Sequence, residues 1–121
     1  MKHIRTLCHS FRNALRGITM TARTERNFRI EIVIAVVVLF GVSVAPLSMT
    51  DRVGAWIVVF IVLIAELFNT AIEHAVDCAT QEHSIVARAA KDAAAGAVLF
   101  AGFGACIYGG FLLWRIGTHI L

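Results

Sequence analysis

Charged residues and proline are scarce in this sequence, whereas apolar residues are abundant. Only 16% of its 121 residues are Asp, Glu, Lys or Arg, and there is a single proline. Soluble domains carry about 25% charged residues. The 59% share of hydrophobic residues is more than a soluble domain of this length can bury, because small domains hide only about 60–70% of the surface of the unfolded chain. The composition argues against a soluble domain and favours one domain embedded in lipid.

Motifs for disulfides, zinc and the common nucleotide-binding loops are also missing. The three cysteines, Cys8, Cys78 and Cys106, form no CxxC pair, so we expect them to be small buried side chains. No GxxxxGK[ST] segment is present, and Gly102-Phe103-Gly104 lacks the third glycine of GxGxxG. No signal peptide is evident, because the first 30 residues contain many arginines and no continuous apolar core.

Three apolar stretches are long enough, or nearly so, to cross a membrane. They cover residues 32–47, 53–72 and 93–114. A spanning helix needs about 20 apolar residues, and a shorter one can be accommodated by flanking residues and bilayer thinning. We therefore expect an all-α integral membrane protein, a single domain over residues 1–121, with transmembrane helices at about 30–48, 53–74 and 93–115.

The first 24 residues predict a helix of another kind. Apolar residues recur at helical spacing on one face, namely Ile4, Leu7, Phe11, Ala14, Leu15 and Ile18. Mostly basic residues fill the other face, namely Arg5, His9, Arg12, Asn13 and Arg16. Such a basic amphipathic helix is suited to the membrane interface. The alternative is a soluble helix packed on a partner.

The distribution of Lys and Arg predicts the orientation in the membrane. Seven of the eleven precede the first apolar stretch, and Arg88 and Lys91 lie between the second and third. Only Arg52 and Arg115 lie on the opposite side. Because Lys and Arg accumulate in cytoplasmic segments, we expect a multi-pass membrane protein with its N-terminus inside and its C-terminus outside.

The second apolar stretch ends in a polar stripe. Glu66, Asn69, Thr70, Glu73 and Asp77 are spaced i, i+3, i+4, i+7 and i+11, which places them on one face of a helix. An ionisable residue within the membrane costs at least about 2.5 kcal/mol and is usually functional. A polar seam between helices is the alternative, but neighbouring carboxylates repel one another unless a cation or protons intervene.

Further polar residues are expected at the same membrane surface. Lys91 and Asp92 open the third stretch, and Glu25 lies at the junction before the first. Together with Glu73 they predict a cluster of carboxylates and a cation. Such a cluster suits Mg²⁺ that carries a polyphosphate, because Mg²⁺ typically uses one or two carboxylates plus phosphate oxygens.

At this point the sequence resembles a known family, the prokaryotic diacylglycerol kinases and undecaprenol kinases. The signature that carries the resemblance is Glu66-Leu67-Phe68-Asn69-Thr70-Ala71-Ile72-Glu73, followed by Val76 and Asp77. Residues 10–18, 24–30 and 90–99 also resemble blocks of the family, so the resemblance covers essentially the whole chain. Phe68 is bulkier than expected there, and Ser84 stands where members often have His.

The resemblance implies a homotrimeric kinase of the bacterial plasma membrane that uses MgATP to phosphorylate a membrane lipid alcohol, with no nucleic-acid partner. Glu66 would be the general base, and Glu25 and Glu73 would bind the metal. The residues implied at the nucleotide are Asn13, Glu25, Asn69, Glu73, Asp77, Glu82, His83, Ser84, Lys91 and Asp92. Those implied at the lipid are Asn27, Phe28, Arg29, Ile30, Glu31, Glu66 and Ala95.

The lipid itself stays open between undecaprenol and diacylglycerol, with a lean towards undecaprenol. Residues 24–30, Arg88 and the run at 94–99 are similar to the undecaprenol branch, whereas Glu31 stands where that branch often has His. Two other functions compete with the kinase. In a small proton- or cation-coupled transporter, Glu66 would be the ionisable group that carries the coupling. In a non-enzymatic assembly subunit, the polar stripe would hold helices together.

Overall fold

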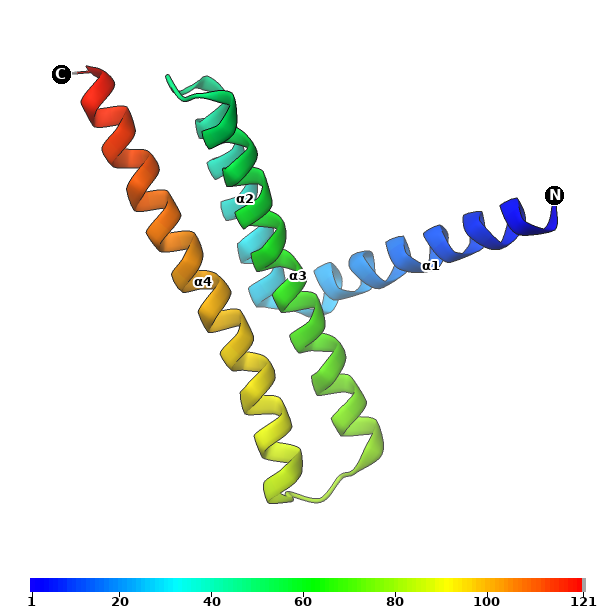
Figure 1. The fold of residues 1–121 in the computed structure, drawn as a ribbon. Helices are drawn as coiled ribbons and strands as arrows, with labels where there is room; N and C mark the ends of the chain where they lie inside the picture. The colour runs from blue at the N-terminus through cyan, green and yellow to red at the C-terminus, as the bar shows by residue number, and fades with distance from the viewer. Residues whose placement is uncertain (121) are drawn as a thin grey trace.

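The structure, a computed structural model, describes residues 1–120, without the side chain of Lys2, and in this range it consists of four α-helices (Figure 1). They are α1 (Lys2–Thr24), α2 (Arg26–Val44), α3 (Met49–Ala79) and α4 (Ile85–Ile120). α2, α3 and α4 are each long and apolar enough to cross a membrane. The prediction of an all-α protein with three candidate spans is therefore confirmed.

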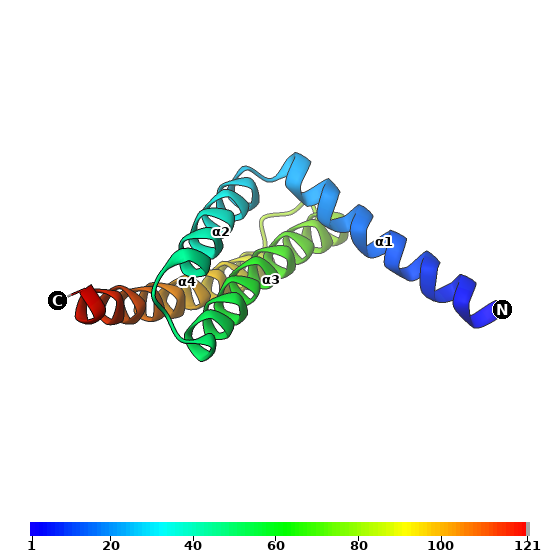
Figure 2. The ribbon, with the colours of Figure 1, turned by 90° about the horizontal axis from the view of Figure 1, so that it is seen from above.

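The helices form an open arrangement rather than a closed bundle. α3 and α4 lie side by side, and α2 packs on α3, whereas α1 projects away from the other three (Figures 1 and 2). Many large apolar side chains of α2–α4 are exposed, as lipid-facing residues would be. Cys8, Cys78 and Cys106 are exposed too, so our expectation that they are buried is wrong: each lies on a helix face that no neighbouring helix covers.

The first span ends earlier than predicted, because the chain turns before Pro46. α2 stops at Val44 rather than near residue 48, and Ala45 has extended backbone angles. The guanidinium group of Arg52 donates hydrogen bonds to the carbonyl oxygens of Ser43, Ala45 and Leu47, at 2.9, 3.1 and 3.3 Å. A cation from the next helix thus satisfies carbonyls that the end of α2 leaves free.

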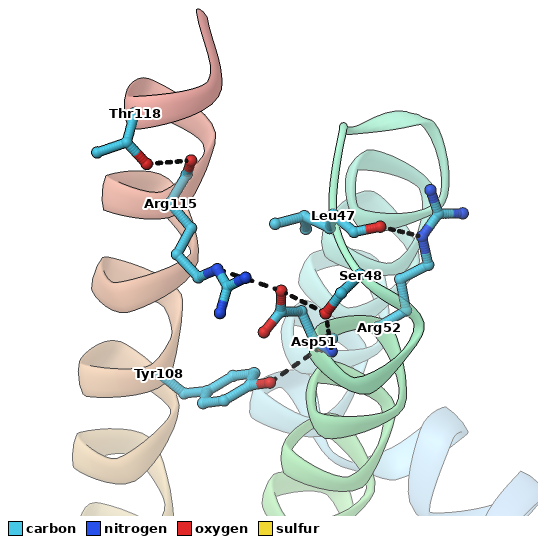
Figure 3. A network of polar contacts seen from close by, with 7 residues as sticks. All are labelled: Leu47, Ser48, Asp51, Arg52, Tyr108, Arg115 and Thr118. Carbon is cyan, nitrogen blue, oxygen red and sulfur yellow. Dashed lines mark hydrogen bonds and ion pairs between the residues drawn. The ribbon is translucent and has the colours of Figure 1, made fainter.

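α3 begins immediately after this turn, and a polar network ties its start to α4 (Figure 3). Ser48 is the N-cap, and its hydroxyl accepts a hydrogen bond from the backbone NH of Asp51 at 3.2 Å. The buried Asp51 carboxylate pairs with Arg115 at 3.4 Å, and the Tyr108 hydroxyl donates to the Asp51 carbonyl at 3.0 Å. Two of these contacts, those with Arg115 and Tyr108, therefore join α3 to α4 at the end of the molecule away from the loop that connects the two helices (Figure 1).

The other ends of α3 and α4 extend beyond the predicted spans. α3 continues to Ala79 and α4 already begins at Ile85, so only residues 80–84 connect them. In Figure 1 these ends reach past the junction of α1 and α2. The extensions carry Asp77 and Lys91, which form an ion pair with each other.

Gly54 allows α3 and α4 to approach each other, and a larger residue there is expected to destabilise the pair. A Cβ atom at Gly54 would collide with the hydroxyl group of Tyr108, which bonds to Asp51. We expect Gly54→Ala to lower the free energy of unfolding by about 1–2 kcal/mol, because overpacking outweighs the better helix propensity of Ala. The measurement is the thermal unfolding midpoint in detergent.

Gly41 provides the matched control for this prediction. It also lies within a helix, but nothing lies within 4 Å of a Cβ atom built there. Gly41→Ala is expected to leave the midpoint unchanged or raise it, since only the helix propensity changes. If Gly54→Ala proved as stable as Gly41→Ala, the close contact with Tyr108 would not constrain the helix pair.

Candidate active site

The polar stripe runs along α3, and its burial falls towards the end of that helix. Glu66, Asn69 and Thr70 are 5%, 9% and 4% exposed, Glu73 is half-buried and Asp77 is exposed. All five lie on one continuous helix, as the spacing predicts. The stripe thus leads from a buried carboxylate to an exposed one over about three turns of helix.

Glu66 is the buried carboxylate, and it has no counter-charge. Among residues 1–120, no hydrogen bond or ion pair reaches its side chain. The carboxylates of Glu73 and Glu25 lie close enough to repel its charge, and Glu66 acts in the same way on Glu31 of α2. An unpaired buried carboxylate is costly to maintain and is free to accept a proton.

Glu25 is placed by the break between α1 and α2. It is the only residue between the two helices, and its backbone is extended. Arg29 stabilises this break, because its guanidinium group donates to the carbonyl oxygens of Ala22 and Arg23 at 3.1 and 2.8 Å. The Glu25 carboxylate is thereby held beside α3, where its Oε1 atom lies 3.9 Å from Nε2 of His74.

Glu73 and Asn69 form the next part of the site. The Asn69 side-chain amide donates to the Glu73 carboxylate at 3.3 Å, while the amide oxygen of Asn69 is buried without a partner. A buried unpaired oxygen calls for a donor or a cation. Among the described residues no group of three or more His, Cys, Asp or Glu side chains is arranged around a metal. The donor set of Glu25 and Glu73 nonetheless fits Mg²⁺, which takes few protein carboxylates and completes its shell with water and phosphate.

A polar pocket of about 610 Å³ lies one turn further along, where α3, the connecting loop and α4 meet. Lys91 of α4 reaches across it and forms an ion pair with Asp77 of α3 at 2.5 Å. The lining residues are Val76, Asp77, Thr80, Gln81, Glu82, His83, Ser84, Ile85, Ala87, Arg88 and Lys91. The pocket therefore combines cationic and hydrogen-bonding side chains, which suits a phosphorylated ligand.

The pocket brings together five of the residues expected at a nucleotide. Asp77, Glu82, His83, Ser84 and Lys91 all line it. The Ser84 hydroxyl also has a structural role, because it accepts a hydrogen bond from the backbone NH of Ala87 at 3.0 Å and so caps α4. The Ser84 hydroxyl therefore stabilises the start of α4 in addition to lining the pocket.

The other five expected nucleotide residues lie outside this pocket: Glu25, Asn69 and Glu73, described above, and Asn13 and Asp92. Asn13 is exposed on α1, where its amide nitrogen is 3.2 Å from Nδ1 of His9. Asp92 is exposed on α4 and faces Arg88 at 3.8 Å. The structure does not bring these two side chains to the pocket.

The residues expected at the lipid occupy different environments. Asn27, Ile30 and Ala95 are exposed. The guanidinium group of Arg29 donates hydrogen bonds to carbonyl oxygens at the end of α1. Phe28 is only 2% exposed, so its ring is packed inside the protein.

Glu31 marks the boundary between the acidic site and an apolar groove. One of its carboxylate oxygens is buried without a partner. It also lines a groove of about 350 Å³ between α2, α3 and α4, with residues such as Ala35, Val62 and Gly109. The groove therefore presents an acidic end near Glu66 and apolar walls elsewhere.

Sequence reasoning missed several side chains at this site. His74 faces Glu25, and Arg88 lines the pocket beside Lys91, as do Thr80 and Gln81. The spacing of Arg88 and Lys91, i and i+3 on one helix, was a usable signal for the second cation. Nothing in the sequence indicated the pairing of His74 with Glu25, because 49 positions separate them and a different helix supplies each.

Comparison with known proteins adds independent information. The family model described as prokaryotic diacylglycerol kinase matches residues 12–113. An undecaprenol kinase from Bacillus subtilis is 45% identical over 104 residues, which cover 83% of this chain and 81% of that protein. A diacylglycerol kinase from Synechocystis sp. is 41% identical over 105 residues, which cover 86% of this chain and 60% of that longer protein.

Proposed function

We propose that this chain, which belongs to the prokaryotic diacylglycerol kinase family and is a lipid kinase, transfers the γ-phosphate of MgATP to the hydroxyl group of undecaprenol. Diacylglycerol is the second candidate lipid. The observation that supports this chemistry best is the unpaired, buried Glu66 on a helix whose same face leads to a polar pocket containing Lys91 and Arg88. Neither the transporter nor the assembly-subunit hypothesis explains that pocket.

Glu66 is proposed as the general base. As the lipid oxygen attacks the γ-phosphorus atom, the hydroxyl proton moves to the Glu66 carboxylate. The bond between the γ-phosphorus and the β–γ bridging oxygen breaks, and ADP leaves. This role fits the environment of Glu66, because a carboxylate without hydrogen bonds or counter-ions accepts a proton readily.

The polar pocket is proposed as the nucleotide site. Phosphoryl transfer requires positioning and neutralisation of charge rather than a protein nucleophile. Lys91 would exchange Asp77 for a phosphate oxygen, and Arg88 would add a second cation. Asn69, Glu82, His83 and Ser84 are proposed as further ligands, and Asn13 and Asp92 as contributors from a neighbouring subunit.

Glu25 and Glu73 would hold the magnesium ion. When bound, the ion would offset the negative charge of the ATP phosphates. Both carboxylates lie within electrostatic reach of Glu66. The free oxygen of Asn69 would then accept a hydrogen bond from a water molecule or the nucleotide.

The lipid is proposed to approach from the membrane beside α1 and α2. Asn27, Phe28, Arg29, Ile30, Glu31 and Ala95 would border it, with Glu31 nearest to Glu66. In this arrangement α1 lies in the cytoplasmic interface, the C-terminus is outside and three copies form the enzyme. Undecaprenol is placed first because the relative named for it is both more similar and more completely covered.

The experiment that tests this proposal follows labelled phosphate from MgATP into lipid, with purified protein in mixed micelles. Undecaprenol and diacylglycerol are offered separately, and micelles without either lipid are the blank. We expect labelled lipid in both cases, with a higher kcat/KM for undecaprenol. Absence of labelled lipid from correctly folded protein would overturn the kinase assignment, and a preference for diacylglycerol would overturn only the choice of lipid.

A further inference from the structure

Four arginines form a single row along α1. Arg5, Arg12, Arg16 and Arg23 are spaced i, i+7, i+11 and i+18, and each interval is close to a whole number of helical turns. Their Cα atoms therefore lie along one line, about 27 Å long at ~1.5 Å per residue. Residues 1–24 contain no Asp or Glu.

The row has no partner within the described part of the chain. All four arginines are exposed, and no ion pair involves them. Four of the five other arginines have partners in the described part of the chain, Arg26 being the exception: Arg29 and Arg52 bond to carbonyls, Arg88 faces Asp92 and Arg115 pairs with Asp51. A row of unpaired cations on one helix is thus a local feature of α1.

An apolar face accompanies the row. Leu7, Phe11 and Ile18 are 74%, 67% and 43% exposed, because α1 points away from α2–α4 (Figure 2). At 100° per residue the arginines lie about 140° round the helix from these side chains. If the apolar face inserts into the bilayer, long arginine side chains extend to the depth of the lipid phosphates.

We propose that this row binds the phosphates of anionic phospholipids, so that α1 gathers such lipids around itself. Guanidinium groups bind phosphate oxygens in a bidentate manner, and a row without acidic neighbours complements a negatively charged leaflet. The proposal rests on the interfacial position of α1 that the proposed function includes. Nucleotide phosphate is the weaker candidate, because no residue of α1 lines the polar pocket of the same chain, and Asn13, the α1 residue proposed at a neighbouring nucleotide site, is not part of the row.

Cys8 provides a site for the test, since it is exposed on α1. The full chain carrying Cys78→Ser and Cys106→Ser is labelled at Cys8 with a fluorophore and placed in nanodiscs of phosphatidylcholine with 20 mol% phosphatidylglycerol. In parallel samples a spin label is attached either to the anionic or to the neutral lipid. Fluorescence quenching then reports which lipid lies next to α1.

We expect the anionic quencher to be enriched severalfold beside α1 at 50 mM salt, since one arginine near such a surface contributes roughly a factor of five. The enrichment should disappear near 0.5 M salt, because the electrostatic screening length becomes shorter than the distance between the arginine side chains and the lipid phosphates. Arg5→Gln, Arg12→Gln and Arg16→Gln together should remove it. The matched triple replacement by Lys, which keeps the charge, should retain most of it.

Equal quenching by both lipids at low salt would overturn the proposal. A triple Gln variant that keeps the enrichment would also overturn it. A triple Gln variant that keeps the enrichment but loses affinity for ATP would assign the row to the nucleotide instead. The quenching does not require catalysis. Failure of lipid phosphorylation with intact enrichment would therefore refute the proposed function and leave this inference standing.

Discussion

Glu66→Gln is expected to lower kcat for lipid phosphorylation by about 10²–10⁴-fold, which is the usual contribution of a general base. The amide cannot accept the hydroxyl proton, although it has nearly the shape of the carboxylate it replaces. Because Glu66 is surrounded by the negative charges of Glu73 and Glu25, loss of its own charge should not destabilise the protein. The measurement is the steady-state rate in mixed micelles together with the thermal unfolding midpoint.

Asp51→Asn is the matched control for this substitution. Asp51 is the other buried carboxylate of α3, but it lies at the opposite end and pairs with Arg115. Its replacement should lower the unfolding midpoint and leave kcat per folded molecule unchanged. A Glu66→Gln enzyme with full turnover would remove the general-base assignment, and a large loss of kcat in Asp51→Asn would show that the assay responds to folding alone.

Lys91→Gln is expected to lower kcat/KM for ATP by about 10²–10³-fold. Removal of one positioned group that stabilises transition-state charge usually has an effect of this size. Lys91 is the cation that crosses the pocket between α3 and α4. The change should appear when ATP is varied at saturating lipid, whereas KM for the lipid should stay close to its original value.

Asp77→Asn separates a role in binding from a role in holding the helices together. It weakens the same ion pair but leaves the lysine cation in place. We therefore expect a much smaller loss of kcat/KM for ATP than in Lys91→Gln. Equal losses in the two variants, with equal falls in unfolding midpoint, would mean that the pair only joins α3 to α4.

Several features of the protein follow from the sequence without any knowledge of packing. The three apolar stretches predict three candidate spanning helices, and the structure has them. The spacing of Glu66, Asn69 and Thr70 places them on one face of α3. Both inferences depend only on hydropathy and on the angle between successive residues of a helix, which are local properties of the chain.

Other features depend on contacts between distant segments. The carbonyls of Ser43 and Ala45, at the end of α2, are satisfied by Arg52 of the next helix, and Glu25 lies beside α3 because Arg29 stabilises the break after α1. The pocket that contains Asp77 and Lys91 exists because α3 and α4 extend past their spans and pair.

The sequence by itself determined which residues carry charge into the membrane and which helix presents them. Only the tertiary structure decided that Glu66 lacks a partner, whereas Asp51 has one. Periodicity locates a side chain on the face of its own helix, but its solvation and its counter-charges depend on what other helices bring to that face. Glu66 meets the like charge of Glu25, which the junction of α1 and α2 brings to it, in addition to that of Glu73 on its own helix. Asp51 instead meets the opposite charge of Arg115, which α4 brings to it.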